Sequence, residues 1–248
     1  GRELKEEEIP AIPFSKEELV LAKVLGQFLE LRVDKDAEGN GLTMKHQDEM
    51  LKGRFADERK GKLLYDTSWY KDETFFTADT PRLQWVLVGT EVIPGSTGKN
   101  AVAQTRVLAD YVMNIVFKDQ EMPEEYVQAL KEFDAQEKEI TGLMSTDWQE
   151  CNRRLSALKL NQLCRRNLAE AMFDTEMHLD NTGERLLPYM YDRTTRLSSH
   201  DRLVRIGYAD SAGAGGADAR SVADQRALHA AGRNRGQPRQ DPRWRRLR

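Results

Sequence analysis

The sequence predicts an α+β protein with a mixed N-terminal region, a helical middle, a truncated β-rich C-terminal module and a disordered basic tail. Two observations predict the mixture. Residues 29–33 alternate between apolar and polar side chains and the apolar run 85–88 begins a second strand, whereas apolar residues recur at helical spacing from about 99 to 180. A third observation is the amino-acid composition of residues 209–248, which contain nine Arg, four Asp, no Lys and no Glu. That segment has a net charge of +5, whereas residues 1–208 have a net charge of −8. We therefore expect a boundary near residue 208.

The expected organisation has four parts. Residues 1–14 form a flexible N-terminus, and residues 15–182 form a mixed body whose second half is helical. Residues 183–208 begin a small β-rich module, and residues 209–248 form the disordered tail rich in Arg, Ala and Gly.

The first half of the body contains clear helix and turn signals. Ser15 and Glu18 have capping-box spacing, which predicts a short helix after Ser15. Residues 29–33 alternate between apolar and polar side chains, which predicts a half-buried strand. Thr43 is an expected N-cap, and a second strand is expected from Trp85 to Ile93.

Residues 54–83 are irregular and rich in aromatic side chains. We expect these aromatic residues to pack over a core edge rather than to bind a ligand. They are Trp69, Tyr70, Phe75 and Phe76.

The helical middle is predicted from apolar stripes, which are usually core positions rather than cofactor seams. Pro123 suits a first helical position, Asp147 or Thr146 suits an N-cap, and Gly183 follows the last helix as a C-cap. After Pro188 the periodicity is lost, and the clearest strand lies over residues 203–206.

The loop between the second strand and the following helix resembles a phosphate-binding loop. Backbone amides of Gly95, Ser96, Thr97, Gly98 and Lys99, together with the helix N-terminus, are the candidate anion-binding groups. Ile93 and Asn100 occupy the two positions where GxxxxGK[ST] requires Gly and Ser or Thr. The favoured interpretation is an ordinary capped loop.

The sequence indicates no catalytic residues, cofactor or metal site. The four His are far apart, and although Asp174 and His178 share one face of a helix, two ligands do not make a zinc site. We expect that face to be solvated. Neither Cys151 nor Cys164 suggests a nucleophile, so an enzyme is disfavoured.

The basic tail suggests an alternative function in nucleic-acid binding. Its arginines can neutralise phosphates and its tryptophan can stack on a base. The candidate residues are Arg233, Arg235, Arg239, Arg243, Trp244, Arg245 and Arg246. The favoured explanation of the tail is a frameshifted reading of a GC-rich gene.

The composition also bears on location. No stretch approaches the length of a membrane span, and no secretory signal precedes Ser15, so a cytoplasmic protein is expected. Because the chain begins with Gly, the N-terminus is a candidate for truncation.

Several segments carry a family resemblance. Residues 16–51, 80–100 and 158–188 resemble a family of uncharacterised proteins from uncultured bacteria of the candidate phyla, and NTGERLLP, followed by Ser198 and Ser199, is the most specific part. In that family the chain ends in a module similar to the C-type-lectin-like fold of formylglycine-generating enzymes. Diversity-generating retroelements use this fold to vary binding residues. The resemblance is lost after about Gly207.

The resemblance implies a non-enzymatic binding or ligand-display protein with an unknown ligand or protein partner. The alternatives are nucleic-acid binding through the tail and a nucleotide-binding enzyme that uses residues 95–99.

Overall fold

The chain forms an α+β fold, as the sequence predicts. The computed structural model describes residues 4–64, 67–187, 190–207 and 218–219. Helices occupy about half of the described chain, and the strands form two small antiparallel sheets. The tail arginines lie outside the described residues. Of the tail expected to be disordered, residues 209–248, only Asp218 and Ala219 are described, and they pair with the strand over residues 203–207 instead of being disordered.

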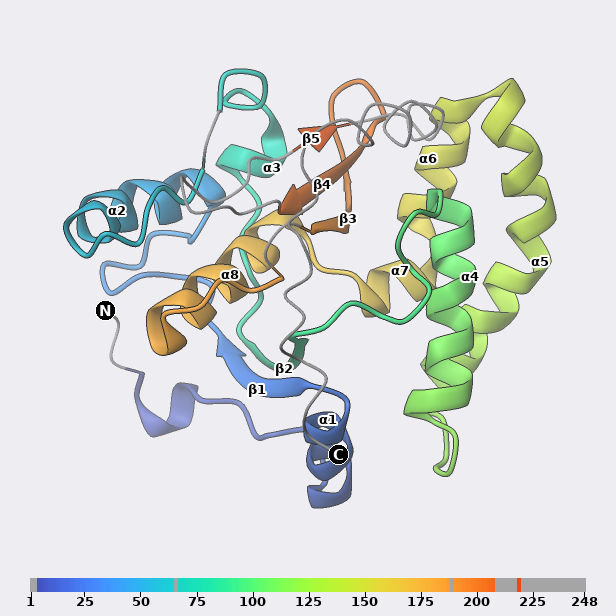
Figure 1. Ribbon diagram of the computed structural model, residues 1–248, viewed down its shortest axis with the longest axis horizontal. Coiled ribbons are helices and arrows are strands. Elements are labelled where there is room, and N and C mark those ends of the chain that lie inside the picture. The colour runs from blue at the N-terminus through green and yellow to red at the C-terminus, as the bar shows by residue number, and fades with distance from the viewer. Residues whose placement is uncertain (1–3, 65–66, 188–189, 208–217, 220–248) are drawn as a thin grey trace, which may run out of the picture.

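The N-terminal half contains a two-stranded sheet flanked by helices (Figure 1). Strands β1 and β2 pair in antiparallel register, so that Gln27 lies opposite Gly89 and Arg32 lies opposite Gln84. A short 3-10 helix precedes α1. These elements are the 3-10 helix Glu6–Glu8, α1 Lys16–Val24, β1 Gln27–Arg32, α2 Met44–Asp57, α3 Thr74–Thr77 and β2 Gln84–Gly89.

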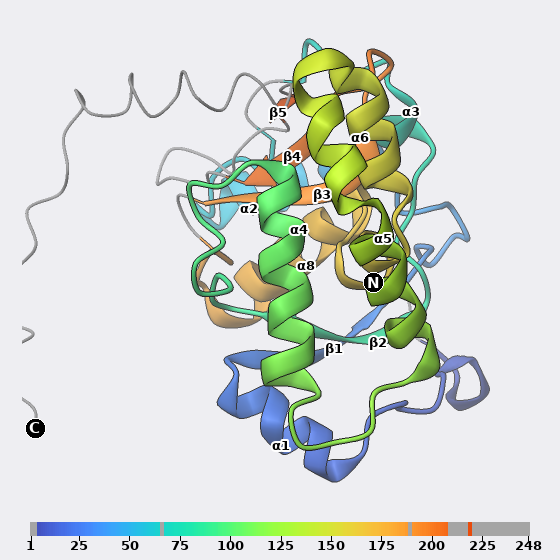
Figure 2. The same ribbon diagram turned by 90° about the vertical axis from the view of Figure 1, so that its right-hand side faces the viewer.

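The middle of the chain is helical, and α4 to α7 gather on one side of the molecule (Figures 1 and 2). A π-helical turn extends α4, and Leu158 separates α6 from α7. These elements are α4 Ala101–Tyr111, the π-helical turn Val112–Val116, α5 Glu124–Thr146, α6 Trp148–Ala157 and α7 Lys159–Cys164.

The last described elements are α8 and a three-stranded sheet in the order β3-β4-β5. Helix α8 begins at the capping box of Asn167 and Glu170, and it ends where Gly183 adopts the left-handed backbone with φ of 76°. The bounds are α8 Leu168–Thr182, β3 Tyr191–Leu197, β4 Leu203–Gly207 and β5 Asp218–Ala219.

Several local signals are confirmed. Ser15 and Glu18 form a capping box, Thr43 caps α2, and Asp147 caps α6 through the backbone N–H of Glu150. Two expectations need correction. The second strand ends at Gly89, short of Ile93, and the helix expected after Asp147 is broken because Leu158 has an extended backbone.

Buried apolar residues form two clusters, and the sheet β3-β4-β5 lies between them. One cluster joins α2, α3 and α8 to Val204 and Ile206 of β4. The other joins α4 to α7 to Leu203 of the same strand. Because neighbouring strand residues face opposite sides, β4 contributes to both clusters.

The aromatic segment before β2 belongs to the first cluster. Tyr70, Phe75 and Phe76 are buried, and the Tyr70 ring contacts both phenylalanine rings, whereas Trp69 is 41% exposed. The expected packing role is confirmed for the three buried rings.

Candidate functional site

A network of ion pairs crosses the interior between the two sheets, and Asp174 of α8 lies at its centre. Arg32 of β1 donates Nε and Nη2 to the two Asp174 carboxylate oxygens, each over 2.7 Å. Arg166 donates Nη1 to Asp174 Oδ2, also over 2.7 Å. Burial alone raises the pKa of Asp174, but Arg166 and Arg32 outweigh burial, so its pKa is lowered. Asp174 is therefore an ionised, doubly bound anchor.

The alternation that predicts β1 is confirmed, but its polar face points inward. Glu30 and Arg32 are the buried side chains of the strand, and both face α8. An alternating pattern fixes which residues share a face, and the apolar set usually faces the core. In β1 the polar face is the buried one, because the Asp174 carboxylate of α8 neutralises the positive charge of Arg32.

Glu170 extends the network from the first turn of α8. Its Oε2 accepts the backbone N–H of Asn167, and its Oε1 accepts Arg82 Nε over 3.0 Å. Arg32 Nη1 lies 3.7 Å from Glu170 Oε2. The same carboxylate thus caps the helix and lies close to two arginines that precede β2 in the sequence, Arg32 in β1 and Arg82 just before β2.

Glu30 holds a proton inside this network. Burial, and then the charge and hydrogen bond of Asp174, raise the pKa of Glu30 from 4.5 to about 8, against the opposing effect of Arg32 and Arg166. No donor among the described residues reaches the buried Oε2 of Glu30. A hydrogen bond between two carboxyl groups needs a proton on one of them, so Glu30 is the neutral donor and Asp174 the ionised acceptor at neutral pH.

Arg166 connects the network to the C-terminal sheet. Its Nε and Nη2 donate to Asp192 Oδ2 of β3 over 3.1 and 2.6 Å, and its backbone carbonyl accepts the Thr195 N–H. The Arg166 side chain is 18% exposed and that of Asp192 is 32% exposed. The Arg166–Asp192 ion pair is thus fixed by the buried Asp174 carboxylate, and part of the pair is accessible to solvent.

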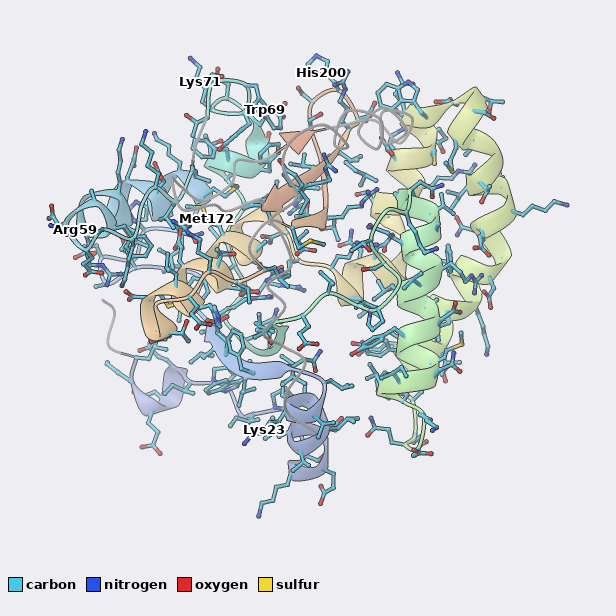
Figure 3. The ribbon with its side chains drawn as sticks, in the orientation of Figure 1. Lys23, Arg59, Trp69, Lys71, Met172 and His200 are labelled. Carbon is cyan, nitrogen blue, oxygen red and sulfur yellow. The ribbon has the colours of Figure 1, made fainter. Side chains whose placement is uncertain are left out.

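The exposed part of that ion pair lines a pocket of about 40 Å³. Except for Arg166, Asp192 and Thr175, the lining side chains are apolar. Met172 lies inward on α8 in Figure 3, whereas Arg59, Lys71 and His200 lie at the outline. The lining residues are Leu63, Leu64, Arg166, Ala171, Met172, Thr175, Leu186, Leu187, Met190, Asp192, Ile206 and Gly207.

Gly207 closes one wall of the pocket where β4 ends. Its φ is 134°, and a Cβ atom at this position would lie 2.1 Å from the Met190 carbonyl oxygen. Only glycine allows the chain before β3 to approach β4 this closely. The pocket wall therefore depends on a residue without a side chain.

A smaller cavity of about 10 Å³ lies on the opposite face of the sheet, between Arg165 and Arg193. The hydroxyl groups of Thr105, Ser156 and Thr194 also line it, and each donates to a protein oxygen. Because each hydroxyl donates its hydrogen elsewhere, it can only accept a further hydrogen bond, and the space is about that of one water molecule. This cavity suits a bridging water rather than an anion.

The predicted anion-binding loop lies far from this network in the sequence and is largely exposed. Gly95 and Gly98 have φ of 75° and 71°, and the Ser96 N–H donates to the Ile93 carbonyl. The side chain of Asn100, rather than Ser96 or Thr97, caps α4 by accepting the Ala103 N–H. Thr97 and Lys99 are exposed, and the anion-binding role of residues 95–99 stays a prediction.

The face of α8 that carries Asp174 is not solvated, which corrects the expectation from sequence. Asp174 and Glu176 are buried, and His178 stacks on Phe28. Among the described residues no group of three or more His, Cys, Asp or Glu is arranged to hold a metal ion. The two thiols are also shielded: burial raises the pKa of Cys151 to about 11 and that of Cys164 to about 12.

Sequence reasoning missed Arg32, Arg166, Asp174 and Asp192 as a connected set. One signal was present, since residues 168–182 contain four carboxylates but no Lys or Arg. An amphipathic helix whose charges are all acidic needs cationic partners from other elements. The partners themselves cannot be read from the sequence because they come from residue 32 and from residue 166.

Comparison with known proteins adds no assignment. The chain matches no protein-family model, no curated protein and no solved structure. In the described part of the chain, no helix combines the length and apolar character needed to cross a membrane. The arginines proposed to bind nucleic acid, residues 233–246, lie outside the described residues.

Proposed function

We propose that the protein is a non-enzymatic binding protein that recognises an aliphatic group in the pocket between α8 and the C-terminal sheet. One observation carries the proposal: an apolar chamber has the fixed Arg166–Asp192 ion pair at one end. Binding sites commonly combine apolar walls with a few polar groups that orient the ligand.

The size of the pocket limits what enters it. A volume of about 40 Å³ is far below the several hundred Å³ that hold a drug-sized molecule. It suits a short aliphatic group, such as the side chain of one residue of a partner. The proposed ligand therefore places only one small group in the pocket.

The polar end of the pocket is already organised. Asp174 and Asp192 hold Arg166 from two elements, so little side-chain freedom is left to lose when a ligand binds. This rigidity favours recognition. The expected ligand-display role and the lectin-like resemblance are consistent with a binding surface beside β3 and β4, and both remain proposals.

The test is selection of binders from a displayed random-peptide library, followed by titration against a pocket-filling variant. Ala171 is buried and lines the pocket, so Ala171→Leu fills it. Ala135→Leu, on the exposed face of α5, is the matched control. We expect selected peptides to share an aliphatic residue and to bind Ala171→Leu at least about tenfold more weakly than wild type.

Peptides that bind Ala171→Leu and wild type equally, with both proteins folded by circular dichroism, would contradict the proposal. The nucleic-acid alternative makes a different prediction. It requires salt-sensitive DNA binding that is lost when residues 209–248 are deleted.

A further inference from the structure

The polar end of the pocket identifies the chemical class of the ligand. We infer that the pocket binds a carboxylate attached to a short aliphatic stem, with the stem in the apolar chamber and the carboxylate on Arg166. This inference rests on the proposed function and deepens it.

The first support is the donor count of Arg166. A guanidinium has five N–H groups, and Arg166 uses its Nε–H and one N–H on each terminal nitrogen for Asp174 and Asp192. Within the described part of the chain, one N–H on each terminal nitrogen remains. Two such donors suit the two oxygens of a carboxylate, which forms short, charge-assisted hydrogen bonds with arginine.

The second support is the charge around the pocket end. Asp174 is bound by both Arg32 and Arg166, and Asp192 is bound by Arg166. The two guanidinium groups balance the two carboxylates of these ion pairs, so this set of residues carries no net negative charge that would repel an anion.

The third support is the division of the pocket into two chemical parts. Met172 and Ile206 line the apolar part together with leucines from the segments after α2 and α8. A stem of three or four carbons removes its surface from water there, while its carboxylate stays near the partly exposed Arg166. A longer acid exceeds the volume, and a bare anion leaves the apolar part unfilled.

Two sources can supply this chemistry: a free short-chain carboxylic acid, and the C-terminal residue of a peptide that ends in an aliphatic side chain. Both present a carboxylate next to a small branched stem. The experiment therefore includes one probe for each source.

The experiment is a titration of the full chain with small probes, in which binding is measured from the methyl NMR signals of Met172 and Ile206. The small probes are isobutyrate, isobutyramide and isobutylamine, which share one stem and differ in charge. We expect isobutyrate to shift the pocket methyl signals with a dissociation constant on the order of 1 mM, as suits so few atoms. The amide and the amine should bind at least about tenfold more weakly.

The peptide probes are Gly-Gly-Val with a free carboxylate and the same peptide as its amide. Tighter binding of the peptide acid than of isobutyrate assigns the site to a protein C-terminus. Exclusion of the peptide together with binding of isobutyrate assigns it to a free acid. Both results support the inferred class.

Arg166→Lys retains the charge but loses the planar fork, so it should weaken isobutyrate binding about tenfold. Arg202→Lys, in the exposed turn between β3 and β4, is the matched control and should bind as wild type does. Because the probe series uses the wild-type chain, the test stands even where the Arg166 variant fails to fold.

Equal binding of isobutyrate and isobutyramide would overturn the inferred carboxylate and leave the proposed aliphatic pocket intact. Absence of any shift with all probes would overturn the inference as well. The peptide-library selection then decides separately whether the proposed function stands.

Discussion

Glu30→Gln tests whether the interior holds a protonated carboxyl group beside Asp174. A glutamine amide has the shape of a neutral glutamic acid and can donate to Asp174 in the same way. The variant therefore keeps the hydrogen bond and removes only the ability to ionise.

The magnitude follows from the raised pKa of Glu30. Its pKa is about 8 in the folded protein, against an ordinary value of 4.5. The folded state therefore binds a proton that the unfolded state has released, and this stabilising contribution is complete below pH 4.5 and is lost as the pH rises through 8. The free energy of unfolding falls by about 1.4 kcal/mol per pH unit inside that window.

The assay is urea unfolding of wild type and Glu30→Gln at several pH values from about 5 to about 8. Because other titrating groups are common to both proteins, the difference in unfolding free energy isolates Glu30. That difference should move in favour of the variant by about 3 kcal/mol across the range. Glu121→Gln, at an exposed position, is the control and should run parallel to wild type.

A constant difference between Glu30→Gln and wild type over this range would refute the reasoning. It would mean that Glu30 is ionised in the folded protein, with Arg32 and Arg166 compensating both carboxylates. The interior network would then have one more negative charge than we assign to it.

Three further predictions concern single positions. Arg32→Ala should lower the free energy of unfolding by about 3–5 kcal/mol, because Asp174 loses a buried counter-charge; a loss below about 1 kcal/mol in urea unfolding would show that the pair is energetically idle. Gly183→Ala should cost about 1 kcal/mol, since alanine resists the left-handed C-cap of α8, and an unchanged thermal midpoint would contradict that strain. Gly207→Ala should shift the methyl NMR signal of Met190 and lower the thermal midpoint, because a Cβ atom meets the Met190 carbonyl; a spectrum identical to wild type would show that the contact is easily relieved.

The local features of the fold could be predicted from sequence because their causes are local. A Ser or Thr before a helix satisfies N–H groups within the next three residues, and Gly183 relieves a steric clash at its own position. The signals at Ser15, Thr43 and Gly183 therefore identify true helix ends. The α+β class follows from the same short-range periodicities.

The candidate site could not be predicted because its causes are distant in the sequence. Alternation in residues 29–33 shows that Glu30 and Arg32 share a face, but only Asp174 makes that face the buried one. The break at Leu158 likewise has no Gly or Pro signal beside it. The face of α8 that carries Asp174 is buried rather than solvated because Arg32 and Arg166, both outside the helix, bind that carboxylate.

The inward polar face of β1 also has a consequence for the newly made chain. Arg32 and Asp174 are 142 residues apart, so β1 leaves the ribosome long before α8 can cover it. During that interval Glu30 and Arg32 are hydrated and charged, so the positions that α8 later covers expose charged rather than apolar side chains to neighbouring chains. In water Glu30 ionises at its ordinary pKa, and burial beside Asp174 raises that pKa to about 8. Docking of α8 onto β1 is therefore accompanied by uptake of one proton at neutral pH.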